Sequence, residues 1–290
     1  MADTSGQADL RGLDIDKLAK GFADEQNVLK AYCTVSPTSA REIRWYQKTS
    51  GFLDSTDTTG ITASQIANTS FRSRPVVVEQ SWTRNTSYVK KYFVESPTIS
   101  EEDIRDCDVD ILATNVRDLT RAVERQVDSR IYTVISTAAG VGTSGATAVW
   151  DVPANAFIIT DILTMQNGIR EYGYDPQGAV LLLNNTDYKD MLAYLIETKG
   201  SSIPGFSSEK VKSGVVMEIL GNKVVVSPLF TTDQAVMFVP QQSCTWKSFM
   251  PVTAVTIDDP GIGKKIRVWE EGEAICTDPK SVYVLTNTQT

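Results

Sequence analysis

The sequence predicts an α+β protein in which one long helix lies against a β-sheet and a smaller α/β domain is inserted between the two. Three observations lead to this prediction. One amphipathic stripe runs from Ile104 to about Thr137, strand-like segments flank it at 41–94 and 244–285, and mixed helix and strand patterns fill the stretch that follows the helix.

The first observation is the stripe itself, whose apolar residues recur every three or four positions and so share one helix face. They are Leu112, Val116, Leu119, Val123, Val127, Ile131 and Val134. Opposite charges three residues apart, such as Asp118 and Arg121, favour the same conformation. At 1.5 Å per residue we expect a helix roughly 45–50 Å long, which needs a sheet along most of its length.

Both ends of this helix carry a sequence signal. Ser100 is followed by three acidic residues, which is typical of an N-cap with acids in the first turn. Glycines begin at Gly140 and predict the end of the helix.

The chain before the helix divides into two parts. Residues 1–44 are polar and weakly patterned, and we expect a helix at Ile15–Tyr32 that docks on another part of the molecule, with disorder as the alternative. Strands are predicted at Arg41–Lys48, Pro75–Arg84 and Ser87–Val94. Because the first two flank the long polar stretch Ser50–Ser70, they predict a projecting β-hairpin.

The chain after the helix begins with an α/β section. Its expected elements are a helix at Pro153–Gly173, a buried strand at Gly178–Leu183, a helix that opens at Asn185, a hairpin formed by Val215–Leu220 and Lys223–Pro228, and a short strand at Ala235–Val239.

The C-terminal part of the chain is almost entirely strand-like. Strands are expected at Val252–Ile257, Lys264–Trp269, Ala274–Thr277 and Val282–Leu285. We expect this final sheet to lie under the long helix, so that residues of about 100–140 contact 245–290.

Composition argues against catalysis and against a membrane protein. The 290 residues include no histidine, which removes the usual general base and the commonest metal ligand. The four cysteines have no metal-site spacing, and no apolar run is long enough to span a membrane. The N-terminus has no apolar core, so no secretion signal is predicted. We therefore expect no enzyme activity, no catalytic residues, no cofactor and no metal site.

Three motifs resemble ligand sites but lack the required context. The run Gly140–Gly145 matches a dinucleotide fingerprint, yet it follows a helix and precedes an extended segment. Asp106, Asp108 and Asp110 alternate like a calcium loop but lack its glycine and its final glutamate. The run Gly261–Lys265 is too short for a phosphate-binding loop.

Charge separates along the chain. Residues 41–95 carry eight basic and five acidic side chains, whereas 99–138 carry five basic and nine acidic ones, within a chain of net charge −8. A basic projecting hairpin on an acidic chain predicts contact with another copy of the same chain. The predicted contact residues are Arg72, Arg74, Arg84, Lys90 and Lys91 on the basic side and Glu101, Glu102, Asp103 and Asp106 on the acidic side.

This order of elements resembles the major capsid proteins of tailed double-stranded DNA viruses, which have the HK97-type fold. The segment Asp108–Arg130 is the closest local match and looks like the spine helix of that family. The resemblance implies an N-terminal arm at 1–44, an E-loop at 45–98, a spine helix of the P-domain at 99–138, an A-domain at 139–240 and P-domain strands at 241–290.

The resemblance also implies partners and a location. Copies of the chain would form pentamers and hexamers of an icosahedral shell around DNA that is held without sequence-specific contacts. The spine helix begins about 100 residues from Met1, so we expect a separate scaffolding protein, together with a portal and decoration proteins. The protein would be made in the host cytoplasm and reside in the virion. Lys48 and Asn287 have the residue types that cross-link some members, but nothing in the sequence pairs them.

Three other functions fit parts of the sequence. An encapsulin-like nanocompartment shell has the same fold but encloses enzymes, and the helix at Ile15–Tyr32 could serve as its cargo pocket. A β-rich virion protein associated with the surface or the tail would form no closed shell. An enzyme would need a carboxylate or lysine mechanism, for which the sequence shows no convergent set.

Overall fold

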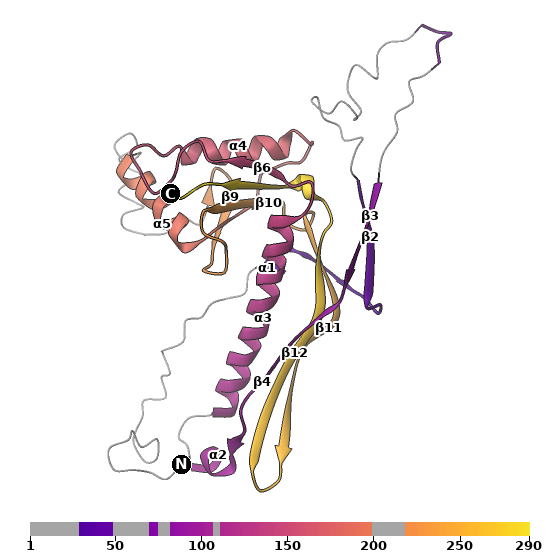
Figure 1. Ribbon diagram of the computed structural model, residues 1–290, viewed down its shortest axis with the longest axis vertical. Helices are drawn as coiled ribbons and strands as arrows, with labels where there is room; N and C mark the ends of the chain where they lie inside the picture. Colours follow the sequence, from indigo (N-terminus) through magenta and orange to yellow (C-terminus); the bar gives the residue numbers. More distant parts are fainter. Residues whose placement is uncertain (1–28, 49–69, 75–81, 107–110, 199–217) are drawn as a thin grey trace.

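A computed structural model of the chain describes residues 29–48, 70–74, 82–106, 111–198 and 218–290. They form one long helix, a two-stranded hairpin and two larger sheets (Figure 1). No helix in these ranges is long and apolar enough to cross a membrane.

The long helix is α3, Ile111–Thr137, which at 1.5 Å per residue is about 40 Å long. It lies along a sheet of strands β1 (Thr34–Pro37), β11 (Cys244–Asp259), β12 (Gly263–Cys276) and β4 (Lys90–Glu95), to which β5 (Ile99–Ser100) adds at one end of β12 (Figure 1). Val127, Ile131 and Ile135 are at most 1% exposed on the face towards the sheet. The prediction of a long helix packed on C-terminal strands is confirmed.

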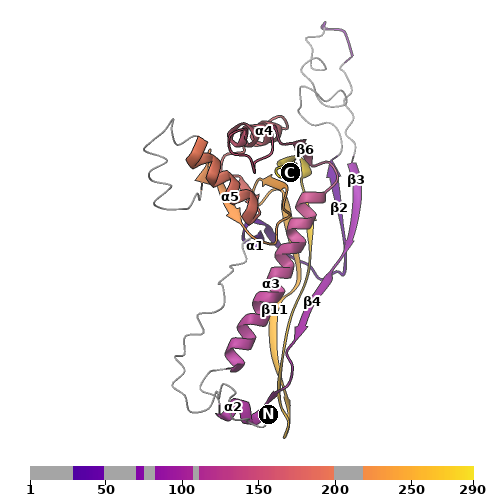
Figure 2. The ribbon, with the colours of Figure 1, turned by 60° about the vertical axis from the view of Figure 1, so that its left-hand side comes forward.

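The start of this helix differs from the prediction. Ser100 does cap a helix, because its Oγ accepts a hydrogen bond from the Asp103 backbone N–H at 3.1 Å. That helix is the separate α2, Glu101–Asp106, and α3 begins only at Ile111 (Figure 2). The prediction of one helix from Ile104 is therefore wrong. The intervening sequence Asp106–Asp110 holds three aspartates, which disfavour a helix interior and repel one another; residues 107–110 lie outside the described ranges.

The projecting hairpin is confirmed. Strand β2 (Glu42–Lys48) pairs antiparallel with β3 (Trp82–Tyr88), from Glu42 opposite Tyr88 to Lys48 opposite Trp82. After Val89 the chain continues as β4, which leaves the hairpin and pairs with β12. The break between these two strands therefore falls at Val89, whereas the prediction placed it at residues 85–86, between the strands Pro75–Arg84 and Ser87–Val94. Most of the predicted polar excursion, and residues 75–81 of the predicted second strand, lie outside the described residues.

The inserted domain is a six-stranded sheet with helices α4 (Ile158–Arg170) and α5 (Asn185–Ala193), followed by a π-helical turn at Tyr194–Thr198. Its strand order is β6 (Gly142–Gly145), β13 (Val282–Thr286), β10 (Gln234–Phe238), β7 (Val180–Leu183), β9 (Asn222–Val226) and β8 (Glu218–Ile219). All four residues of β7 are buried, as the sequence predicts. Residues Gly142–Gly145 form a strand, so the glycine motif does not open a helix.

Two C-terminal strands differ from the prediction. Strand β13 belongs to the other sheet, where it pairs with β10 and β6, although its Val282 and Val284 share a buried cluster with Ile131 of α3. Its Val282, Val284 and Leu285 are at most 1% exposed, which is typical of a central strand between two neighbours. The predicted strands at Lys264–Trp269 and Ala274–Thr277 are one strand, β12, because pairing with β11 continues through Glu271, Gly272 and Glu273.

Of the predicted N-terminal helix, only α1 (Leu29–Tyr32) lies within the described residues. It packs on α3 through Leu29, which is 1% exposed, and the Tyr32 carbonyl accepts a hydrogen bond from the Gln241 N–H at 2.7 Å. The segment that follows it, β1, pairs parallel with β11. This part of the chain is anchored to the long-helix sheet.

We expect Asp161→Ala to destabilise the inserted domain. Asp161 is 1% exposed, and its carboxylate accepts hydrogen bonds from the Thr147 N–H at 3.0 Å and from Trp150 Nε1 at 2.9 Å. Removing the acceptor leaves buried donors unsatisfied, at a cost of about 1–3 kcal/mol each. Urea unfolding of the unassembled subunit measures the loss. The exposed Thr164→Ala on the same helix is the control, with a change within about 0.5 kcal/mol; equal stability of both variants would contradict this role.

Candidate functional site

Three buried carboxylates lie next to one another on β12, where the hairpin leaves the long-helix sheet. The side chains of Glu270 and Glu273 are fully buried, and that of Glu271 is 7% exposed. Gly272 lies between them, and a Cβ there would come within 2.4 Å of Trp246 Cζ2. Buried carboxylates are costly unless paired with cations, so their partners determine what the strand can hold.

Together the three carboxylates bind several separate parts of the chain. Glu270 pairs with Lys30 of α1. Glu271 accepts from Arg41 Nη1 at 3.1 Å and lies 3.8 Å from Lys91 Nζ, which joins it to both ends of the hairpin segment. We call these three carboxylates and their basic partners the charge junction; its members are Lys30, Arg41, Lys90, Lys91, Arg130, Glu270, Glu271 and Glu273.

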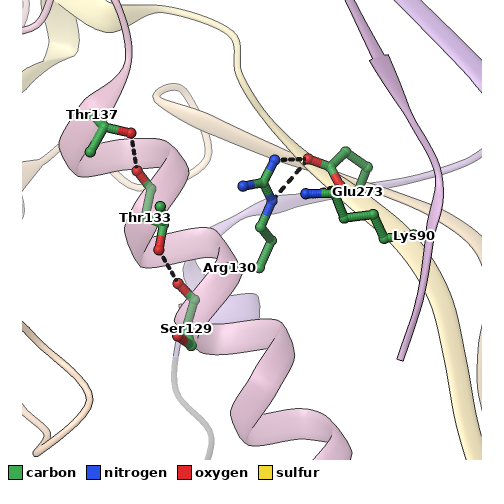
Figure 3. Close-up of polar contacts among 6 residues, drawn as sticks. All are labelled: Lys90, Ser129, Arg130, Thr133, Thr137 and Glu273. Carbon is green, nitrogen blue, oxygen red and sulfur yellow. Dashed lines mark hydrogen bonds and ion pairs between the residues drawn. The ribbon is translucent and has the colours of Figure 1, made fainter. Parts of the chain in front are cut away.

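Glu273 links the hairpin segment to the long helix. Both Nε and Nη2 of Arg130 donate to Glu273 Oε1, with the Nε contact at 3.0 Å (Figure 3). Lys90 Nζ lies 4.0 Å from the second oxygen of this carboxylate, Glu273 Oε2 (Figure 3). Removing the partner of such a buried charge costs about 3–5 kcal/mol in measured cases. The position of α3 relative to β4 therefore depends on this carboxylate.

Aromatic rings support the cations of the junction. The Arg41 guanidinium lies 4.7 Å from the centroid of Phe249, and Lys91 Nζ lies 5.0 Å from that of Phe93. Lys30 Nζ lies 5.7 Å from the Trp246 ring, while its backbone N–H donates to Asp128 at 3.2 Å. Cation–π contacts add to the ion pairs and restrict where each long side chain can point.

The low polarity of this region changes the acidity of a nearby tyrosine. Burial first, and then the neighbouring Glu273 carboxylate, raises the pKa of Tyr92 to about 12. The buried oxygens Glu270 Oε2 and Glu273 Oε2 accept no hydrogen bond from any described residue. Lys90 Nζ is near Glu273 Oε2, but at 4.0 Å it forms an ion pair without a hydrogen bond.

The charge junction links several separate elements of the fold. Its ion pairs join α1, the two ends of the hairpin segment, α3 and β12 at one place. Within the described ranges, no three His, Cys, Asp or Glu side chains are grouped so as to hold a metal ion.

The predicted contact residues lie at two distant places. Arg72 and Arg74 are exposed in the segment 70–74, and Arg84 is exposed on β3. Lys90 and Lys91 lie at the start of β4; they pair with carboxylates of their own chain while their side chains stay 49% and 52% exposed.

The acidic set lies on α2. Glu101, Glu102 and Asp103 form its first turn and Asp106 is its last residue, while Arg105 Nη2 lies 3.5 Å from Glu101. Helix α2 lies at the far end of α3 from the hairpin (Figures 1 and 2). The structure does not bring the two sets together within one chain.

Sequence reasoning missed the three glutamates of the junction. They fall in the short run Glu270–Glu273, which interrupts an apolar pattern and was assigned to no strand. The available signal was their position between two strand-like segments without a turn dipeptide, which favours one continuous strand with buried acids.

Comparison with known proteins gives consistent results. The sequence pattern of the phage capsid protein family matches residues 83–285. The capsid protein of cyanophage P-SCSP1u is 12% identical with a TM-score of 0.65, covering 91% of this chain and 88% of its own. That of the bacteriophage PhiM1 mature capsid is 13% identical with a TM-score of 0.63, covering 99% and 91%.

A third similar structure is a virus-like particle from Pyrococcus furiosus, 15% identical with a TM-score of 0.58, covering 95% of this chain and 97% of its own. At these identities the likeness shows a shared fold. No curated protein matches the sequence.

We expect Glu271→Gln to loosen the hairpin. The change removes the negative charge that binds Arg41 and Lys91. A loss of about 1–2 kcal/mol from the free energy that keeps the hairpin closed would raise the population of molecules with an open hairpin about 5–30-fold. Hydrogen exchange of the unassembled subunit measures this in 42–48 and 82–88, with 180–183 as an internal reference. Glu95→Gln, which removes a more exposed pair with Arg267, is the matched control. Unchanged exchange of the hairpin in Glu271→Gln would show that the junction does not hold it.

Proposed function

The chain belongs to the phage capsid protein family and is a structural major capsid protein of HK97-type fold, and from this premise we propose how its copies join. They assemble as pentamers and hexamers of an icosahedral shell around double-stranded DNA. The hairpin formed by β2 and β3 lies on a neighbouring copy, and its basic residues face that copy's α2.

The observation that carries this proposal is the exposed face of the hairpin. The register places Tyr46 opposite Arg84, so aromatic and basic side chains share one face. Tyr46, Trp82 and Tyr88 on this face are 64%, 57% and 64% exposed. Large aromatic side chains gathered on an isolated ribbon are typical of an interaction surface. Such a surface is buried when a second molecule covers it.

Charge identifies the kind of surface that covers it. Glu102 and Asp103 are exposed in the first turn of α2, and Arg84 is exposed on the hairpin. The two sets of opposite charge lie too far apart to meet within one chain, so they favour head-to-tail contact between copies. Such contacts form a ring when the rotation that relates successive copies returns to the first copy. Arg72, Arg74, Lys90 and Lys91 extend the basic side, and Glu101 and Asp106 extend the acidic side. This arrangement supports closed capsomers.

The remaining parts of the proposal concern other partners. The net charge of −8 disfavours tight phosphate binding, so packaged DNA is held without sequence-specific contacts. A separate scaffolding protein, a portal and decoration proteins complete the particle, which is assembled from protein made in the host cytoplasm. The subunit performs no catalysis. The family match favours this function over a nanocompartment that encloses enzymes.

Electron microscopy and a nuclease-protection assay test the proposal. We expect the full-length chain, expressed with the other virion proteins, to form closed shells of uniform size that protect DNA. Shells that contain protein and no protected DNA would contradict the DNA-enclosing function in favour of the compartment. Small uniform oligomers without shells under all conditions would contradict assembly itself.

We expect reversal of Arg72 and Arg74 to glutamate to prevent shell formation while the subunit stays folded. The double reversal places like charges against α2 of the neighbour, and each such contact costs free energy at every interface of the shell. Shell yield by sedimentation and subunit folding by circular dichroism measure the two effects. The charge-preserving pair Arg72→Lys and Arg74→Lys is the matched control and should assemble. Normal particles from the reversed variant would refute the predicted contact.

A further inference from the structure

A groove of about 320 Å³ lies behind the hairpin, on the side opposite its exposed aromatic face. One wall is the hairpin, with Trp45 and Asn85 among its residues, and the other is the last part of α3, with Arg130 and Thr137. Its floor is the end of β12, including Glu273. Figure 3 shows the helix wall and Glu273. The groove is thus a continuation of the charge junction.

The floor of this groove is an open strand edge. Strand β4 pairs with β12 only as far as Lys90 opposite Gly272, after which the chain passes into the hairpin. On the other side, β11 pairs with β12 up to Cys276. Among the described residues, Glu273–Cys276 therefore have no strand neighbour on the groove side. This edge is about 13 Å long, enough for a short added strand.

Two buried polar atoms belong to side chains that line the groove and have no hydrogen-bond partner in the described part of the chain. They are Trp45 Nε1, a donor, and Glu273 Oε2, an acceptor. Buried polar atoms are nearly always paired in native structures. An extended peptide presents both N–H and C=O groups, so it can satisfy an open strand edge and such atoms together.

The charges at the groove favour an acidic occupant. Arg130 and Lys90 both face Glu273, so two cations surround one carboxylate. The threonine hydroxyls of the helix wall already have partners within α3. The Thr137 hydroxyl donates to the Thr133 carbonyl, and the Thr133 hydroxyl donates to the Ser129 carbonyl (Figure 3). A segment can therefore cover this wall without leaving a hydroxyl unsatisfied.

We propose that the groove binds an extended, acidic segment of a second copy of this chain, which adds as a strand to the edge Glu273–Cys276. The inference rests on the proposed assembly, because a shell places another copy beside each hairpin. The hairpin is then held on both faces by neighbours: its aromatic face lies on one copy, and the groove behind it receives a segment of another.

Filling the groove tests this proposal. Thr137→Trp places an indole in the groove, whereas Thr133→Trp, one helical turn away and outside the groove, is the matched control. We expect the yield of closed shells to fall about tenfold or more for Thr137→Trp, because each subunit loses one favourable contact with its neighbour. The control should give the normal yield. Circular dichroism and thermal unfolding establish that both subunits are folded. Normal shells from a folded Thr137→Trp variant would overturn the proposal.

Photo-cross-linking identifies the occupant independently of that variant. A small diazirine amino acid replaces Thr137 or, as the control, Thr133, and particles are irradiated and digested for mass spectrometry. We expect a dimer-sized product at position 137 only, joined to an acidic segment of another copy. Adducts at 137 that lie solely within one chain, or on a different protein, would overturn it. If shells form normally but no cross-link between copies appears, this inference fails while the proposed function stands.

Discussion

The burial of three carboxylates on one strand is the constraint on which the rest of the structure depends. Glu270, Glu271 and Glu273 are removed from water on β12, and each requires a cation nearby. Those cations come from α1, from both ends of the hairpin segment and from α3. Segments separated by more than two hundred residues in sequence are thereby held at one place.

This arrangement explains how a long, thin subunit can be rigid enough to build a shell. Apolar packing of α3 on β12 fixes the distance between helix and sheet, but it is non-directional and leaves the hairpin undefined. Ion pairs with buried carboxylates are directional, and they lie where the hairpin leaves the sheet. The direction of the hairpin, and so the position of its aromatic face relative to the far end of α3, follows from the junction. A closed shell requires that direction to be the same in every copy.

The parts of the fold that follow from periodicity could be predicted from sequence. The apolar stripe of α3, the hairpin strands and the buried strand Val180–Leu183 each have a local pattern. The aspartates at 106–110 are a sequence signal for a helix boundary, but the prediction of one continuous helix rested on the length of the apolar stripe. Strand β13 has a pattern that fits either sheet, and only its pairing with β10 and β6 decides between them.

The candidate site was less accessible to sequence reasoning. Lys90 and Lys91 were identified from charge, but their partners Glu271 and Glu273 lie about 180 residues away, and no local pattern relates them. The segregation of basic and acidic segments was visible, whereas the separation of the two sets to opposite ends of α3 required the fold (Figure 1). Buried charge is difficult to predict because charged residues are usually exposed.

The most direct test of this account is electron microscopy of a variant in which Glu270, Glu271 and Glu273 are all replaced by glutamine, under conditions in which the wild-type chain forms closed shells. The account predicts that the variant subunit keeps its six-stranded domain, as judged by hydrogen exchange, but forms open or irregular assemblies. Closed shells with the diameter and the yield of the wild type would contradict the claim that buried carboxylates set the direction of the hairpin.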